Sequence, residues 1–180
     1  GKTVLACARE AGKTPYDFSR DLIVEEENRV SMIGFAMSED NLERVLAHPL
    51  VMVGSDGNAL ADYGPLSDGN PHPRSYGTCP RVLGRFVREK KIMPLETAVR
   101  KMSGMPADSF GLEGRGYLRE GYFGDVAVFD PDTVIDTATW SDPHRYPAGI
   151  PYVVVNGRVA VREGEHTGEL AGMVIRKGRV

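Results

Sequence analysis

The chain has 180 residues, 41% of them hydrophobic and 26% charged, which is typical of a soluble globular protein with one domain or slightly more. A formal net charge of −3 argues against a nucleic-acid partner. No apolar run approaches the roughly 18 residues of a membrane span, so no membrane partner is expected. The two cysteines, Cys7 and Cys79, show no metal-ligand spacing and suit thiols in a reducing compartment, which indicates a cytoplasmic protein.

The first third of the chain alternates predicted helices with predicted strands. Thr14 is the expected N-cap of one helix, and Ser38 is the expected N-cap of a second helix over 39–48. Strands are predicted at 30–35 and 50–54. The second of these is a continuous apolar run, which fits a parallel strand that is covered on both faces.

Two further helices and then a β-rich tail follow. The helices are predicted at 80–91 and 94–104 from their apolar periodicity. After about residue 114, short β-branched runs alternate with turn residues, and the Asn156-Gly157 pair is a strong signal for a two-residue hairpin. The strands of this small antiparallel sheet are predicted at 125–130, 152–164 and 173–178.

Alternation of strands and helices indicates a parallel sheet, but only two parallel strands are predicted, whereas a (β/α)8 barrel needs eight. The chain also begins with GKTVLACARE, which has neither an initiating methionine nor the features of a signal peptide. We therefore expect an α/β chain that is the C-terminal piece of a larger enzyme or half of an assembly.

An aspartate stands at the end of the second predicted strand, in VMVGSDG (51–57). Asp-Gly is a common turn signal, and on these residues alone a turn is the favoured interpretation of Asp56. The ends of strands are also where α/β enzymes keep catalytic carboxylates. The pattern by itself leaves both roles open.

Several longer motifs surround and follow Asp56, namely GSDG, PHPRSYGTCPRVLGRF, PLETAVRKMSGMPADSFGL and GRGYLREGYFGDVAVFD. Together they resemble the C-terminal part of the N-acyl-D-amino-acid deacylases, or D-aminoacylases, of the metal-dependent amidohydrolase superfamily. The resemblance extends upstream to RVSMIGFAMSEDN and downstream to the end of the chain. DVAVFD and VNGR occur across amidohydrolases generally, whereas the stretch from Pro71 to Gly84 is specific to the deacylases.

This resemblance implies a (β/α)8 TIM barrel of the metal-dependent-hydrolase type, followed by a small antiparallel β segment. Residues 1–114 would be the C-terminal portion of the barrel, and residues 115–180 the C-terminal β segment of the small β-domain. The predicted strand at 30–35 would then be barrel strand seven, and the one at 50–54 would be strand eight.

The resemblance also places Asp56 on the family's strand-eight aspartate, at the catalytic face of the barrel. A carboxylate there can take a proton from the attacking water and then pass it to the departing amide nitrogen. The family's zinc polarises the carbonyl and lowers the pKa of its water toward about 7. The resemblance permits a contact between Asp56 and that zinc, but the family's main ligands lie on earlier strands that are absent from this sequence.

In NPHPR, Arg74 matches the family arginine that holds the substrate's α-carboxylate, which a guanidinium binds through two parallel hydrogen bonds. The chain departs from the family in two respects. Asn70 replaces the first histidine of the family's HPHPR, and the loop between Asp56 and Arg74 is longer than usual. Without the resemblance, Arg74 is more simply an exposed loop arginine. His72 is expected to support the loop between its two prolines, with a role in the site as the alternative.

The remaining candidates are weaker. His48, His144 and His166 are scattered along the chain and form no metal-ligand motif. Asp125 and Asp130 stand at the two ends of a β run and are expected to hold turns.

The sequence thus predicts the C-terminal portion of a zinc-dependent amidohydrolase that splits N-acyl-D-amino acids into a D-amino acid and a carboxylate. The alternatives are an amidohydrolase of cyclic amides, such as a dihydroorotase or a hydantoinase, and a non-catalytic β-rich module. Without the main ligands, the 180 residues alone are expected to bind no zinc and to have no activity. Besides the substrate, the expected partner is the missing N-terminal barrel portion or, through self-association, a second copy of the chain.

Overall fold

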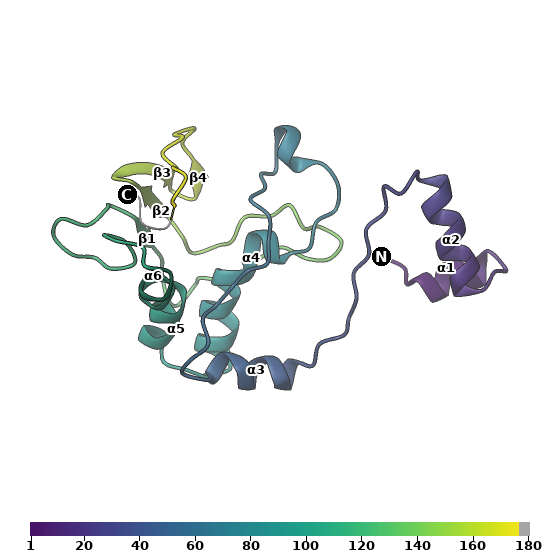
Figure 1. The fold of residues 1–180 in the computed structure, drawn as a ribbon, viewed down its shortest axis with the longest axis horizontal. Coiled ribbons are helices and arrows are strands. Elements are labelled where there is room, and N and C mark those ends of the chain that lie inside the picture. Colours follow the sequence, from purple (N-terminus) through teal and green to yellow (C-terminus); the bar gives the residue numbers. More distant parts are fainter. Residues whose placement is uncertain (177–180) are drawn as a thin grey trace. The chain divides into compact units, whose positions relative to one another are not determined.

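The computed structural model describes residues 1–176 and shows two compact units, one from Gly1 to Ala36 and one from Met37 onward (Figure 1). The first unit is a pair of helices, α1 (Val4–Glu10) and α2 (Pro15–Glu25), that pack against each other. The second unit contains the other helices and the sheet.

Both predicted helix starts are confirmed. The hydroxyl of Thr14 accepts a hydrogen bond from the N–H of Asp17 at 3.1 Å at the start of α2. Ser38 accepts one in the same way from the N–H of Asn41 at 3.4 Å, where α3 (Glu39–Ala47) begins. Each hydroxyl satisfies one of the N–H groups that the first turn of a helix leaves without an intrahelical partner.

The helical part of the second unit confirms the helices predicted at 80–91 and 94–104 and adds two that the sequence did not predict, α4 and α6. The helix predicted from residue 80 starts earlier, because α4 leads directly into it. In chain order the elements after α3 are the 3-10 turn η1 (Gly64–Ser67), α4 (Arg74–Arg81), the π-helix η2 (Val82–Glu89), α5 (Leu95–Met102) and α6 (Gly104–Phe110).

The change from α4 to η2 coincides with a proline inside the helix. Pro80 lies one residue before the end of α4, and it has no N–H to donate to the carbonyl of Tyr76 four residues earlier. From Val82 the helix continues with the wider π geometry, as in the bond from the N–H of Lys90 to the carbonyl of Arg85 at 2.9 Å. The two segments therefore form one continuous helical rod.

The core of the second unit lies among α3, η2 and α5. Leu83 and Phe86 of η2 are buried, and they belong to one cluster with Leu46 of α3. Ala98 of α5 and Val134 are fully buried in the same cluster. Because burying a side chain of this kind stabilises a protein by about 1.5–3 kcal/mol, these contacts fix the helices of this unit against one another.

The sheet is a four-stranded antiparallel meander at the C-terminal end of the chain, drawn in green to yellow in Figure 1. The predicted hairpin is confirmed, since Asn156 and Gly157 both have positive φ angles, 49° and 79°, as a two-residue turn of this type requires. The chain is therefore an α/β protein with a small antiparallel sheet. Its strands are β1 (Val126–Val128), β2 (Tyr152–Val155), β3 (Arg158–Arg162) and β4 (Glu165–His166).

Three strand predictions fail wholly or in part. Residues 30–35 and 50–54 are not strands, because no strand within residues 1–176 pairs with them and a strand exists only through its ladder. In the predicted strand at 173–178, residues 173–175 are irregular, Arg176 forms a single bridge, and the last two residues lie outside the described part of the chain. Over residues 1–176, no helix is long and apolar enough to cross a membrane.

A buried lysine joins α5 to the chain that leads toward Asp56. The Lys101 side chain is 1% exposed, and its ammonium donates to the carbonyls of Leu46 at 2.8 Å, Val51 at 3.0 Å and His48. Burial lowers the pKa of Lys101, whereas three carbonyl acceptors favour its protonated form. The carbonyl of Lys101 in turn accepts the N–H of Val53 at 3.2 Å. One residue thus holds the segment 51–53 from both of its ends.

We predict that Lys101→Met lowers the free energy of unfolding by about 3 kcal/mol, because buried carbonyls lose their donor. Methionine keeps most of the side-chain volume, so the loss reports the hydrogen bonds and not a cavity. Urea unfolding followed by circular dichroism measures the change. Lys91→Met, at an exposed position, is the matched control, and an equal loss in both variants would contradict the prediction.

Candidate active site

Asp56 lies in a strained turn just beyond the segment that Lys101 holds. Its φ angle is 49°, a left-handed conformation that is uncommon for residues other than glycine and that aspartate tolerates better than most. Its side chain is 86% exposed, and the hydroxyl of Ser55 accepts the N–H of Gly57 at 3.2 Å across the turn. The turn therefore presents the Asp56 carboxylate to solvent with little around it.

Arg74 is the first residue of α4, and the structure brings it to Asp56. Its Nη2 atom lies 2.9 Å from Oδ2 of Asp56, and its side chain is 42% exposed. The longer loop between the two residues does not carry Arg74 away. The two residues that the sequence singled out thus meet in space.

A glycine permits this approach. A Cβ atom on Gly57 would lie 2.8 Å from the Cα of Ser75 and 3.0 Å from the carbonyl oxygen of Arg74, which is too close for real atoms. The neighbouring N–H of Asn58 donates to the hydroxyl of Ser75 at 3.2 Å. The turn after Asp56 therefore packs directly on the first turn of α4.

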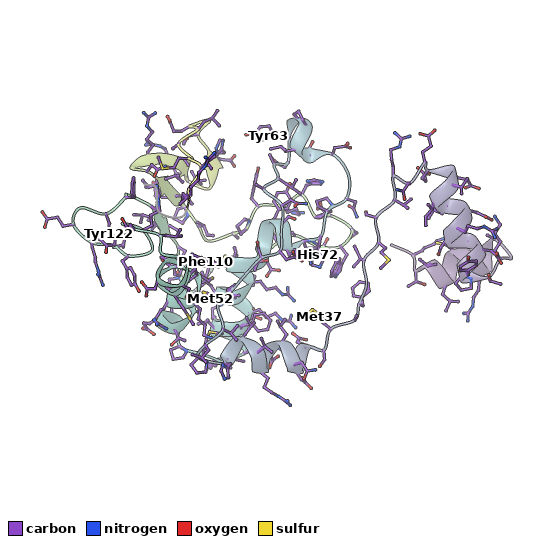
Figure 2. The ribbon with its side chains drawn as sticks, viewed as in Figure 1. Met37, Met52, Tyr63, His72, Phe110 and Tyr122 are labelled. Atoms are coloured by element: carbon purple, nitrogen blue, oxygen red, sulfur yellow. The ribbon has the colours of Figure 1, made fainter. Side chains whose placement is uncertain are left out.

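His72 supports the other side of Arg74, as the sequence predicts. Its Nδ1 atom accepts the backbone N–H of Arg74 at 3.0 Å, and its ring lies edge-on to Trp140 with the ring centroids 4.5 Å apart. Figure 2 shows His72 in the loop that precedes α4. Burial, and then the charge of Arg74, lower the pKa of His72, so the ring is kept in the neutral form that can accept this hydrogen bond.

A cavity of about 330 Å³ adjoins Arg74 between α4 and the segment 136–140. An ion pair lies in its lining, since Arg81 contacts Asp136 at 2.9 Å, and the Asp136 side chain is only 11% exposed. Sequence reasoning found none of the residues from 136 to 140, because only the fold brings them near α4. The cavity is lined by His72, Pro73, Arg74, Gly77, Thr78, Arg81, Asp136, Ala138, Thr139 and Trp140.

Two weaker sequence candidates hold turns, as expected. The carboxylate of Asp125 accepts the N–H of Asn156 at 2.8 Å, beside the hairpin turn. The carboxylate of Asp130 accepts the N–H of Asp132 and the hydroxyl of Thr133, both at 2.9 Å. These contacts use both carboxylates in the architecture of the sheet and its loops.

The donor atoms near Asp56 do not amount to a metal centre. Within the described part of the chain, no group of three or more histidine, cysteine, aspartate or glutamate side chains lies close enough to hold a metal ion. A zinc site in a protein takes three or four protein ligands. These residues therefore do not fit a zinc ion by themselves.

Residues 20–161 match the family described as "Amidohydrolase family". The chain belongs to this family. It is 45% identical to a D-aminoacylase of Alcaligenes xylosoxydans xylosoxydans over 98% of this chain and 34% of the relative. The chain thus spans about a third of the length of this relative. A short stretch, 26% of the chain, is 44% identical to a dihydroorotase of Lactobacillus gasseri over 11% of that protein.

Solved structures of amidohydrolases agree with this assignment. A D-aminoacylase crystal structure superposes with a TM-score of 0.81 at 42% identity, over 96% of this chain and 34% of the other. An N-acyl-D-glutamate deacylase from Bordetella bronchiseptica, solved with zinc and a phosphonate inhibitor, gives a TM-score of 0.74 at the same identity. That match covers 89% of this chain and 31% of the deacylase.

We predict that Gly57→Ala separates Asp56 from Arg74, because the added Cβ forces the turn away from the first turn of α4. A crystal structure of the variant measures the distance between the two side chains. Gly54→Ala is the matched control, since a Cβ there meets nothing within 4 Å and should leave the pair in place. An unchanged Asp56–Arg74 contact in Gly57→Ala would contradict this account of the turn.

Proposed function

We propose that this chain is part of an enzyme that hydrolyses the amide bond of N-acyl-D-amino acids, releasing a D-amino acid and a carboxylate. The observation that carries the proposal is the 2.9 Å contact between Asp56 and Arg74 in a chain that is 45% identical to a D-aminoacylase. In an N-acyl amino acid, the α-carboxylate and the amide nitrogen are attached to the same carbon. A cation that binds the α-carboxylate and a carboxylate that transfers a proton to the nitrogen therefore need to lie close together, as Arg74 and Asp56 do.

Asp56 is the proposed proton-transfer residue. Its carboxylate takes one proton from the attacking water as the water oxygen bonds to the amide carbon. It then gives that proton to the nitrogen as the carbon–nitrogen bond breaks, so the aspartate ends the cycle unchanged. The 86% exposure of its side chain leaves room for water and substrate beside it.

Arg74 is the proposed grip on the α-carboxylate. A guanidinium offers five N–H donors in a planar fork, so it can bind a carboxylate through two parallel hydrogen bonds. The contact with Asp56 supports a position of this fork beside the amide on which Asp56 is proposed to act. Holding the carboxylate in a fixed plane also fixes the neighbouring α-carbon, and this supports selection between D and L substrates.

Zinc is the proposed metal of the complete enzyme, in keeping with the zinc in the solved N-acyl-D-glutamate deacylase. Because the described residues provide no ligand cluster, we assign the main ligands to chain beyond these 180 residues. The same remainder would pair with residues 30–35 and 50–54 as strands seven and eight of a (β/α)8 barrel. In that arrangement residues 1–114 belong to the barrel and residues 115–180 to the small β-domain.

A cyclic amidase is the second candidate, and the short match to a dihydroorotase favours it. That match covers 26% of the chain, against 98% for the D-aminoacylase. Assays of the complete enzyme with dihydroorotate and with N-acetyl-D-amino acids distinguish the two. Turnover of the cyclic substrate alone would overturn the deacylase proposal.

We predict that Asp56→Asn in the complete enzyme lowers kcat by about 10²–10⁴-fold, because an amide cannot carry the proton from water to nitrogen. Steady-state hydrolysis of an N-acetyl-D-amino acid measures this, with circular dichroism to verify the fold. Turnover near that of the wild type would remove Asp56 from the mechanism.

Arg74→Lys is expected to raise KM and to narrow the preference for D over L substrates, since lysine keeps the charge but loses the planar fork. Parallel kinetics with N-acetyl-D- and N-acetyl-L-amino acids test both effects. The exposed Arg29→Lys, in the first unit, is the matched control. If KM and the D/L ratio both stay at their wild-type values, another group holds the carboxylate.

A further inference from the structure

The segment 136–146 contacts the stretch of chain that carries Arg74 at several separate points. Asp136 forms an ion pair with Arg81 of α4. Trp140 contacts the ring of His72, which lies in the loop before α4. His144 contacts the same stretch on both sides of Arg74. None of these partners is close to Arg74 in sequence, so only the fold accounts for their gathering there.

His144 makes two hydrogen bonds that span Arg74. Its Nε2 atom lies 3.0 Å from the carbonyl oxygen of Gly69, and its Nδ1 atom lies 2.7 Å from the hydroxyl of Tyr76. A carbonyl oxygen only accepts, so Nε2 carries the proton and donates it to Gly69. In the neutral ring Nδ1 is then the acceptor, and the Tyr76 hydroxyl donates to it. The imidazole therefore links a residue before Arg74 to one after it.

The tyrosine in this link is itself held in place. The ring of Tyr76 packs at an angle against those of His144 and Tyr146, with centroids 5.6 Å and 5.7 Å apart. Tyr76 lies on α4, two residues after Arg74, so the orientation of its ring and that of the helix start depend on each other. Burial raises the pKa of the Tyr76 hydroxyl, which keeps it protonated and able to donate.

Trp140 provides a second link to the same loop. Its backbone carbonyl accepts the side-chain amide of Asn70 at 3.4 Å, and its ring contacts His72. His72 in turn accepts the N–H of Arg74. Asn70 is the position at which this chain departs from the family's motif, and here it contributes a contact to the link.

We infer that His144 is a positioning residue for Arg74, and that it holds the loop from Gly69 to Tyr76 so that the guanidinium points at the substrate's carboxylate. This inference rests on the proposed role of Arg74. The Arg74 side chain is 42% exposed and forms an ion pair with the exposed Asp56, so its direction depends on the backbone from which it extends. The imidazole does not touch the substrate; it sets the geometry of the residue that does.

His144→Phe in the complete enzyme tests the inference, because phenylalanine keeps an aromatic ring beside Tyr76 but makes neither hydrogen bond. Tyr76→Phe is a milder variant that removes only one hydroxyl. His166→Phe is the matched control, since the exposed His166 lies in β4 and its ring accepts the N–H of Gly168, two residues later. The substrate is an N-acetyl-D-amino acid.

The first measurement is hydrogen exchange of the peptide that contains Arg74, followed by mass spectrometry. Exchange should become faster in His144→Phe and Tyr76→Phe and stay at the wild-type rate in His166→Phe. This readout requires no catalytic activity, so it tests the hold on the loop even if the proposed function is wrong. Unchanged exchange in both test variants would overturn the inference.

The second measurement is a double-mutant cycle with Arg74→Lys. We expect His144→Phe to raise KM about tenfold with little change in kcat, and to have much less effect when Arg74 is already lysine. Equal effects in the two backgrounds would show a merely structural role and overturn the inference. If Arg74→Lys alone leaves KM and the D/L ratio unchanged, the proposed carboxylate grip fails, and positioning by His144 fails with it as a contribution to binding.

Discussion

The Lys101 ammonium joins the helical core of the second unit to the segment that leads to Asp56. Its three carbonyl partners come from the end of α3 and from the residues just beyond it. The last carbonyls of a helix have no intrahelical N–H partner, and the ammonium supplies a donor to them. The lysine itself lies on α5, the helix that contributes Ala98 to the core cluster. An unpaired ammonium at 1% exposure would be costly, and the three carbonyls remove that cost. The direction of the chain from Val51 toward Asp56 is therefore set by the core.

What the sequence could predict of the fold was local. A threonine or serine before an apolar helical stripe identifies a helix start, and Asn156-Gly157 identifies a hairpin, because both signals act within a few residues. The strands at 30–35 and 50–54 were not local in this sense. Their apolar runs indicate burial, but a parallel strand takes its hydrogen bonds from neighbours, and the part of the chain that the structure describes does not provide them. Likewise, no residue near Lys101 in the sequence indicates that its ammonium binds three carbonyls at and beyond the end of α3.

The candidate site divides in the same way. Asp56 and Arg74 could be named from their motifs, and the structure places them together. The distant partners of the Arg74 loop could not be assigned to it, since Trp140 and His144 contact Asn70 and Gly69 across about 70 residues of chain, and a lone histidine carries no pattern of its own. Gly57 could be noted as half of an Asp-Gly turn. That this position must lack a Cβ, because Ser75 is too close, follows only from the packing of Gly57 against α4.

The exposure of the Asp56–Arg74 pair determines which contacts give the site its geometry. An ion pair between exposed side chains is weak, because water screens it and both side chains lose freedom in forming it. In the function proposed above, a substrate carboxylate would therefore take the place of Asp56 on the guanidinium fork at little cost. Because the ion pair is weak, it cannot by itself fix the positions of Asp56 and Arg74 relative to each other. Their alignment must come from the backbone on either side, where Gly57 packs on the start of α4 and His72 accepts the N–H of Arg74. A site built in this way keeps its charged groups free to exchange partners while the chain that carries them stays fixed.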